Sequence, residues 1–290
     1  MQDIDEVADV DQLLLDLYVK RNRLTLPTLP EVAERVRQSL NKPNTTAGQL
    51  AKLLNTDPAL SAKLLQVANS PLYRGRDTIE STQSAVARLG NNIVRELVSS
   101  FAMQQLFNKR RGNDGARALL KQAWAHSVRV AAISQVLAKR YTSLNPEHAM
   151  LAGLMHDIGK LPIIARAGRT PELLQDTPTL LQIATTLHTE LGKVILESWN
   201  FPATLVAVAA EHEDLSRDSG DAVDYVDVVM VANLHSHVGT DHNLAHMDWT
   251  DIPAFRKLGM GPEESLKALH EARLDIMEVQ QLLTGNGEPA

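Results

Sequence analysis

Residues 152–160 read AGLMHDIGK, so an adjacent histidine and aspartate, His156 and Asp157, lie inside an apolar run of helical character. Burying a carboxylate beside an imidazole costs several kcal/mol unless both groups are paired or bind a metal ion. The stretch therefore needs partners from elsewhere in the chain. The histidines that can supply them are His126, His188 and His212.

Four histidines and one aspartate on separate helices form a credible metal-binding set, because helical bundles build metal sites from facing helices. Imidazole and carboxylate together suit iron, manganese, zinc or nickel rather than calcium. We therefore expect at most one divalent transition-metal ion. The alternative for His156 and Asp157 is an internal ion pair that only locks helices together.

Lys160 follows Asp157 by three residues and lies on roughly the same face of the expected helix. It can meet a phosphate group as a point charge. Its other interpretation is an exposed charge at the C-terminal end of a helix, where a cation is favourable.

On both sides of this stretch, the apolar residues of almost every periodic segment have helical spacing. Runs of alternating apolar and polar residues bounded by hairpin turns are missing. The sequence therefore predicts an all-α protein, with Pro30 in the first turn of a helix that runs to about residue 40. The expected helices are 1–23, 30–40, 47–54, 58–69, 82–107 with a break near 89–90, 116–140, 147–157, 179–199, 203–213, 222–236 and one last helix from 262.

Two polar segments interrupt this pattern. Residues 108–115, NKRRGNDG, are expected to connect two helical subdomains. Residues 237–262 are expected to form a loop. The loop contains His237, His242 and His246, and His235 lies just before it on the preceding helix. These four histidines are interpreted as solvated, with a surface transition-metal patch as the alternative. The expected division is an N-terminal helix at 1–21, a helical subdomain at 22–115 and a second subdomain at 116–290 that ends in the last helix.

The composition narrows the class of protein. The 290 residues carry a net charge of -6, aromatic residues are only 4%, and cysteine is absent. These values argue against a broad DNA-binding surface and against a stacking platform for single-stranded nucleic acid. The lack of cysteine excludes disulfides and thiolate metal sites and fits a cytoplasmic protein. The N-terminus has no signal-peptide pattern, and no apolar run is long enough to span a bilayer.

An ordered series of motifs resembles the HD superfamily and, more narrowly, the HDOD family, the HD-related output domain of bacterial signalling. In the second half the series comprises WAHS at 124–127, HAMLAGLMHDIGK at 148–160 and LHTELGKVILESWNFP at 187–202. The first half supports the narrower match with LPTLP at 26–30, DPAL at 57–60, LLQVANSPLY at 64–73 and SAVARLG at 84–90. The resemblance covers about residues 22–236.

This resemblance implies an N-terminal helical bundle docked on a degenerate HD phosphohydrolase-like bundle. It also implies a ligand series in which a first histidine, the His-Asp pair and intermediate histidines precede a distal aspartate. The positions that match are His126, His156, Asp157, His188 and His212. The distal aspartate is expected within residues 229–234, where this chain has Asn233, and the Gly-Tyr-Pro signature of related phosphodiesterases is absent after His212.

Asparagine offers a neutral carbonyl oxygen in place of an anionic ligand. The departure at Asn233 should weaken metal affinity, and it argues against a two-metal site for phosphoryl displacement. The leading interpretation is therefore a non-enzymatic signal-transduction module that acts through a separate protein partner. The alternative is a metal-dependent phosphohydrolase or phosphodiesterase acting on a nucleotide, with Lys160 at the phosphate. The partner, the metal and the oligomeric state stay open at this point.

Overall fold

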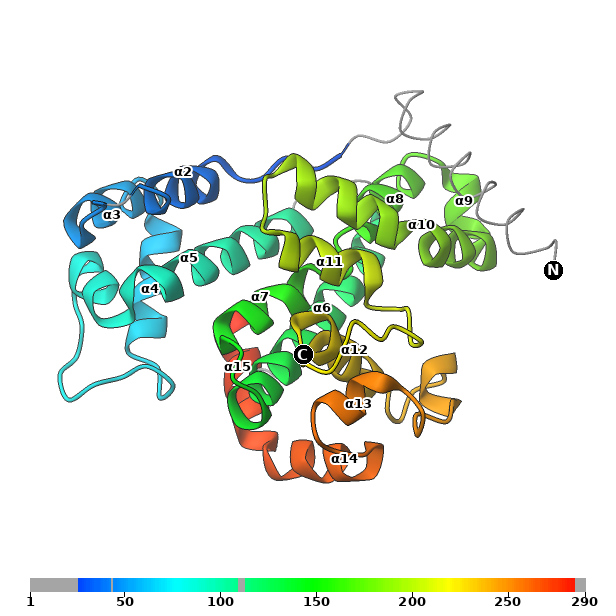
Figure 1. Ribbon diagram of the computed structural model, residues 1–290. Helices are drawn as coiled ribbons and strands as arrows, with labels where there is room; N and C mark the ends of the chain where they lie inside the picture. The colour runs from blue at the N-terminus through cyan, green and yellow to red at the C-terminus, as the bar shows by residue number, and fades with distance from the viewer. Residues whose placement is uncertain (1–25, 43, 109–112, 285–290) are drawn as a thin grey trace.

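The computed structural model describes residues 26–42, 44–108 and 113–284. All regular elements in these ranges are helices, and the described part of the chain contains no strand (Figure 1). This confirms the predicted all-α class. The helix expected over 1–23, and with it the proposed N-terminal unit at 1–21, lies outside the described residues.

The N-terminal half packs three shorter helices against one long helix, α5 (Figure 1). These elements are α2 at Glu31–Leu40, α3 at Ala47–Leu54, α4 at Pro58–Ala68 and α5 at Thr82–Asn108. Thr46 caps α3, and the Asp57 carboxylate accepts hydrogen bonds at the start of α4. Pro30 is the residue before α2 rather than its first residue. The expected break in α5 is confirmed at Gly90, whose φ of 80° favours glycine.

The second half is arranged around α6 and α7, which pack closely against each other and against α12. Helices α8 to α11 lie on one side of this pair, and α13 and α14 lie on the other (Figure 1). The elements are α6 at Asp114–Tyr141, α7 at Pro146–Met155, α8 at Lys160–Ala167, α9 at Pro171–Gln175, α10 at Thr177–Ser198, α11 at Ala203–Glu211, α12 at Tyr225–Ser236, the 3-10 helix η1 at Asn243–His246, α13 at Pro253–Lys257, α14 at Pro262–Glu271 and α15 at Arg273–Thr284.

One apolar core runs through both halves. It contains Phe101 of α5, Val130 of α6 and Leu151 of α7, all of them buried. Helix α5 packs against α7 as well as against α3 and α4, so it carries the core from one half into the other. The division of the chain into two helical subdomains near residue 115 stays a prediction.

The extended segment before α2 also joins the halves. The indole nitrogen of Trp199 donates a hydrogen bond to the carbonyl of Pro27 at 3.1 Å. The Arg37 guanidinium donates to the carbonyls of Trp199 and Asn200 at 3.0 and 2.7 Å. The two Arg37 bonds occupy backbone carbonyls at the C-terminal end of α10, where a cation is favourable.

Two helices between residues 158 and 176 were not predicted, namely α8 and α9. The expected helix at 147–157 ends at Met155, and the chain turns sharply before α8 begins at Lys160. Lys160 is therefore at the start of a helix and not at the C-terminal end of one. The apolar residues on both sides of the turn are buried, so periodicity alone did not reveal the change of direction.

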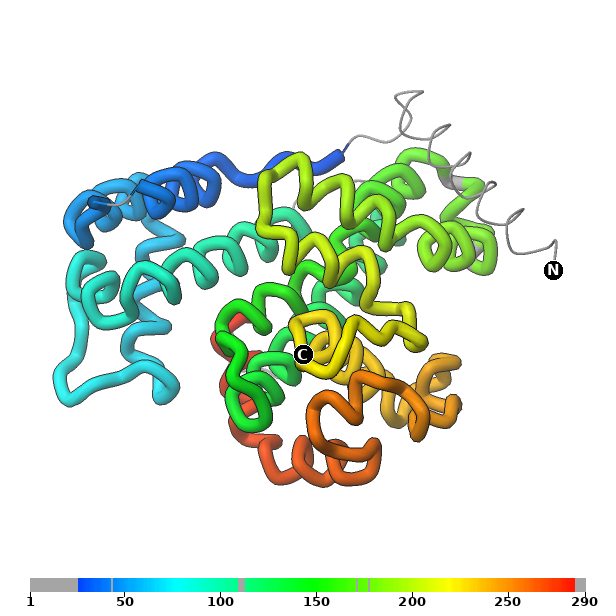
Figure 2. The backbone as a smooth tube through the Cα atoms, viewed as in Figure 1, coloured from blue at the N-terminus to red at the C-terminus, as the bar shows by residue number. Residues whose placement is uncertain are grey.

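The last predicted helix is in fact two helices. Helix α14 ends at Glu271 and α15 begins at Arg273, so the chain bends at Ala272 (Figure 2). The bend leaves Leu266 46% exposed and turns Leu274 to solvent, while Leu269, Val279 and Leu283 are buried. The expected loop at 237–262 likewise contains η1 and α13. None of the described helices is both long and apolar enough to cross a membrane.

His235 is buried and not solvated, which corrects the expectation from sequence. It lies on α12, 7% exposed, with its Nε2 atom 2.7 Å from the Ser265 hydroxyl. Since that hydroxyl donates to the carbonyl of Pro262, it accepts from His235. The rings of Trp249 and Phe255 contact the imidazole edge to face. The residue therefore belongs to the core beneath α14.

This burial predicts a pH dependence of stability. Burial lowers the pKa of His235 from 6.5 to about 4. Between these values the unfolded chain is protonated at His235 and the folded chain is not. We expect the free energy of unfolding to fall as the pH drops from 6.5 towards 4. Urea unfolding of wild type and His235→Gln across this window checks it: the variant should have the shallower slope. Equal slopes would show that His235 does not contribute.

Candidate metal centre

The histidine–aspartate pair lies in the sharp turn between α7 and α8. His156 follows the last residue of α7, and Asp157 precedes the first residue of α8 by three positions. Both side chains are almost fully buried, at 0% and 1% exposure. A turn rather than a continuous helix is what lets both side chains point into the same interior space.

Gly159 brings this turn into direct contact with α10. A β carbon at Gly159 would overlap the carbonyl oxygen of His188 and would lie 2.7 Å from the amide nitrogen of Gly192. Real β carbons essentially never approach backbone atoms so closely. The close contact of backbone with backbone places His188 beside the His-Asp pair.

The hydrogen bonds of the cluster fix the form of each imidazole. The Nδ1 atoms of His156, His188 and His212 lie 2.7, 2.8 and 3.0 Å from carbonyl oxygens three or four residues earlier in the chain. A carbonyl oxygen only accepts, so each Nδ1 carries the hydrogen and each Nε2 presents a lone pair to the cluster. His126 follows the same pattern, with Nδ1 3.5 Å from the Ser236 hydroxyl, which itself donates to a carbonyl.

Asp157 is shared by two sets of histidines that lie on opposite sides of its carboxylate. Oδ2 lies 3.5 Å from His126 Nε2 and 3.4 Å from His156 Nε2. Oδ1 lies 3.4 Å from His188 Nε2 and 3.7 Å from His212 Nε2. The structure thus brings together all five residues that the sequence singled out, as two overlapping groups able to hold a metal ion.

The protonation states follow from burial and from the charges nearby. Burial opposes ionisation of Asp157, but His156 and Lys160 outweigh it and hold the pKa of this carboxyl well below its usual range. Burial lowers the pKa of His126 well below 6.5 and that of His212 to about 4. At neutral pH these groups are therefore a carboxylate and neutral imidazoles, which are the forms that bind metal.

The donor set fits a cation. The Nε2 atoms of His126 and His156 are 3.1 Å apart, and those of His188 and His212 are 3.4 Å apart, with lone pairs facing one another. Asp157 Oδ1, fully buried, has no hydrogen-bond partner among the described residues. Acceptors grouped around a buried carboxylate are stabilised only by a positive charge between them, either protons or a metal ion.

Asn233 faces the same region from α12. It is 4% exposed, it lines the cavity beside Asp157, and its Oδ1 atom has no hydrogen-bond partner in the described part of the chain. The position is thus next to the cluster, but its side chain brings no charge. A second buried acceptor without a hydrogen-bond partner among the described residues again fits a site that takes a cation.

Glu213 is a member of the cluster that the sequence analysis missed. Its Oε1 atom lies 3.4 Å from His188 Nε2 and 4.0 Å from His212 Nε2. Burial opposes its ionisation, but the neighbouring imidazole of His188 lowers the pKa of Glu213 to about 2, so it is a carboxylate at neutral pH. In return Glu213 and Asp157 raise the pKa of His188 despite its burial. The signal in the sequence was its position directly after His212.

Lys160 is tied to the cluster and is not a free surface charge. Its ammonium group donates to Asp157 Oδ2 at 2.6 Å, and the side chain is 27% exposed. A cavity of about 880 Å³ opens beside this pair. Its polar end includes Lys160, Glu213 and Asn233, and its other wall is formed by aliphatic side chains of α6, α8 and α10.

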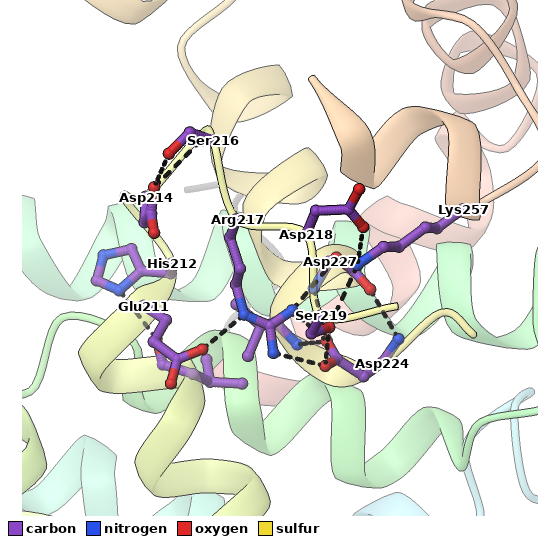
Figure 3. Close-up of polar contacts among 12 residues, drawn as sticks. Glu211, His212, Asp214, Ser216, Arg217, Asp218, Ser219, Asp224, Asp227 and Lys257 are labelled. Carbon is purple, nitrogen blue, oxygen red and sulfur yellow. Dashed lines mark hydrogen bonds and ion pairs between the residues drawn. The ribbon is translucent and has the colours of Figure 1, made fainter. Parts of the chain in front are cut away.

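An ion-pair network holds the segment that follows His212 (Figure 3). Arg217 donates to Glu211 at 2.6 Å and to Asp224 at 2.7 Å, and Figure 3 shows its guanidinium between these carboxylates. Lys257, 1% exposed, reaches the fully buried Asp227 at 3.2 Å. The network ties the end of α11 to the start of α12, so it fixes the backbone next to His212 and Glu213.

The remaining histidines are not one surface cluster. His237 stacks on His126 with ring centroids 5.0 Å apart and on His242 at 3.8 Å, and both line the cavity. Burial is the largest cause that lowers the pKa of His237 to about 4. His246 is exposed. The solvated interpretation therefore holds for His246 and His242, while His237 lies between solvent and the candidate metal centre.

The comparisons with known proteins agree with this architecture. The model of the HDOD domain matches residues 26–215. Among curated proteins there is no match. A solved structure from Shewanella amazonensis SB2B, which carries the provisional name metal-dependent phosphohydrolase, is 29% identical. The similarity covers 98% of this chain and 100% of that one, with a TM-score of 0.77.

Two more distant structures share the fold. An HDOD domain protein of unknown function from Geobacter sulfurreducens is 24% identical over 97% of this chain and 98% of its own, with a TM-score of 0.71. A protein from Marinobacter aquaeolei VT8, provisionally named as a signal transduction protein, is 20% identical over 98% of this chain and 68% of its own, with a TM-score of 0.65. At these identities the likeness concerns the fold.

Proposed function

Because this chain belongs to the HDOD family, we propose that it is a signal-transduction module whose buried cluster holds a divalent transition-metal ion and which acts through a protein partner rather than by hydrolysis. The observation that carries the metal assignment is the set of four Nε2 lone pairs directed at one buried carboxylate, Asp157. Such a set needs a cation, and neutral imidazole with carboxylate favours a transition metal.

The charges around Asp157 favour binding over turnover. Asn233 lines the cavity beside the cluster with a neutral amide, so it adds no second carboxylate for an ion near His126. Lys160, the cation that would receive a phosphate, already donates to Asp157. Freeing it would leave the buried carboxylate with less compensation. We therefore assign the metal ion a role in holding α7, α10 and α11 together, so that metal occupancy and the shape offered to a partner are linked.

A second function, hydrolysis of a phosphate ester, is favoured by one specific observation. The cavity of about 880 Å³ ends at Asp157, Lys160 and His126, large enough for a small ligand with its phosphate at the polar end. The provisional name of the Shewanella protein points the same way. A bound divalent ion supplies Lewis-acid chemistry and lowers the pKa of water. In this function Lys160 would leave Asp157 and pair with the phosphate.

The metal content of protein purified without a histidine tag tests the proposal. We expect elemental analysis to find a bound transition metal in wild type and to find none in the double variant His156→Ala, Asp157→Ala, because the variant removes the shared carboxylate. Equal metal in both would place the site elsewhere and contradict the assignment. Wild type without metal, together with a variant that unfolds early, would leave only an internal ion pair, where removing one buried partner can cost about 3–5 kcal/mol.

A nucleotide-hydrolysis screen of the metal-loaded protein separates the two functions. The leading proposal expects no turnover above that of the double variant. Turnover that disappears in both the double variant and Lys160→Met would instead favour the phosphohydrolase. Turnover unchanged by Lys160→Met would remove the assigned role of the lysine.

A further inference from the structure

Glu213 makes the two sides of the Asp157 carboxylate different, because it adds a negative charge on one side only. On the His126 side, Oδ2 of Asp157 already accepts a hydrogen bond from Lys160 at 2.6 Å, and Asn233, which lines the same cavity, adds no charge. On the other side Asp157 Oδ1 has no hydrogen-bond partner among the residues described, and Glu213 adds a second carboxylate. A divalent ion is therefore better compensated on the Glu213 side.

We infer that Glu213 is a ligand of the metal centre and that the ion lies between Asp157 Oδ1, His188, His212 and Glu213. This inference rests on the proposed function, because it assumes that the cluster holds an ion. It differs from the expectation from sequence, which took the His126, His156 and Asp157 side as the main site and named no glutamate.

The spacing of the four ligand atoms supports a four-coordinate ion. Ligand atoms at 2.0–2.1 Å from a tetrahedral zinc ion lie about 3.3–3.4 Å from one another. Three of the separations here are 3.4 Å: His188 to His212, His188 to Asp157 and His188 to Glu213. The separations from His212 to Asp157 and to Glu213 are 3.7 and 4.0 Å. Glu213, 34% exposed and the outermost of the four, would turn towards Asp157 to complete the set.

Four protein ligands have a functional consequence. Structural zinc sites are closed by four protein ligands, whereas catalytic sites keep one position for water or substrate. Two imidazoles and two carboxylates would give a neutral centre with zinc, which suits a buried position. Asp157, His188 and His212 are buried, and Glu213, at 34% exposure, would close the site on the side of the cavity.

The neighbouring ion pairs make Glu213 well placed for this role. Arg217 clamps Glu211 at 2.6 Å, two residues before Glu213, and also binds Asp224 at the start of α12 (Figure 3). The chain between these points has little freedom, so the glutamate pays a small entropic cost when it binds.

Titration of the metal-free full-length protein with Zn²⁺ by calorimetry tests the inference. Glu213→Gln removes one charge at nearly constant size and should weaken Zn²⁺ binding by at least about tenfold. Glu213→Asp should restore part of that loss. Glu190→Gln is the matched control: it removes an exposed carboxylate from α10, the helix that carries His188, and should keep the affinity of wild type. His126→Gln should weaken Zn²⁺ binding less than Glu213→Gln does.

The outcomes separate the assignment of Glu213 as a ligand from the proposal that the cluster holds a metal ion. A larger loss of Zn²⁺ affinity in Glu213→Gln than in His126→Gln supports the inference. An equal or larger loss in His126→Gln overturns the inference and leaves the proposed metal centre standing. Wild type that binds no Zn²⁺ overturns the proposed function itself. The melting temperature of each metal-free variant shows that a loss of binding is not a loss of folding, and Glu213→Asp serves if Glu213→Gln unfolds.

Discussion

Replacing Gly159 by alanine should destabilise the metal-free protein by about 3 kcal/mol, at the upper end of the usual cost of overpacking. The new methyl group would overlap the carbonyl oxygen of His188 and approach the Gly192 amide nitrogen to 2.7 Å. Both obstacles are backbone atoms of α10 and cannot move aside as a flexible side chain can. Urea unfolding followed by circular dichroism measures the loss.

The same substitution should weaken metal binding, because relieving the overlap moves α10 and with it His188 away from Asp157. Gly48→Ala is the control. Its β carbon would meet only the Gln83 side chain at 3.8 Å, and within α3 alanine is a better helix former, so stability should rise slightly. A Gly159→Ala protein as stable as wild type would show that the turn and α10 are not in close contact.

The helices were predictable because their signals are local. Thr46 and Asp57 identify the starts of two helices through side chains that can cap them, and Gly90 marks a break through its own backbone freedom. The turn after Met155 has no such signal, since buried apolar residues continue on both sides of it. The bend at Ala272 was missed for a similar reason, because the helical spacing of apolar residues continues across it. Leu266 fits this spacing but is exposed.

The sequence predicted most residues of the site, but it did not predict how they are arranged. The motif resemblance named His126, His188 and His212 because their order along the chain is that of a known family. Sequence spacing could not reveal that Asp157 lies between two groups of histidines, since that depends on the packing of α10 and α11 against the turn. Glu213 was overlooked because an acidic residue beside a histidine is commonly a solvated charge.

The position of Asn233 leads to the second large effect, the one expected from Asn233→Asp. The two side chains are nearly equal in size, so the variant should fit, but residue 233 is 4% exposed and its Oδ1 atom has no hydrogen-bond partner among the described residues. Without metal the new carboxylate would be buried near Asp157, at a cost of several kcal/mol or a strongly raised carboxyl pKa. The metal-free variant should therefore melt well below wild type.

A divalent ion should reverse this effect. Attraction between opposite unit charges 4 Å apart is worth about 4 kcal/mol at an effective dielectric constant of 20, and desolvation offsets part of it. The variant should bind Mn²⁺ more tightly than wild type, and the His126 side of the cluster should accept an ion in addition to the one at Glu213. Its melting temperature should then rise more steeply with added Mn²⁺ than that of wild type.

Melting curves at increasing Mn²⁺ measure both halves of this prediction, and calorimetry gives the number of ions bound. Asn92→Asp, an exposed position on α5, is the control and should respond like wild type. A variant that melts lower and gains nothing from metal would mean that residue 233 faces no cation site. The His126 side would then be an ion pair, and the neutral side chain at 233 would serve packing alone. A second bound ion would instead identify Asn233 as the residue that keeps this side of the centre empty, which ties the loss of one carboxylate to binding without turnover.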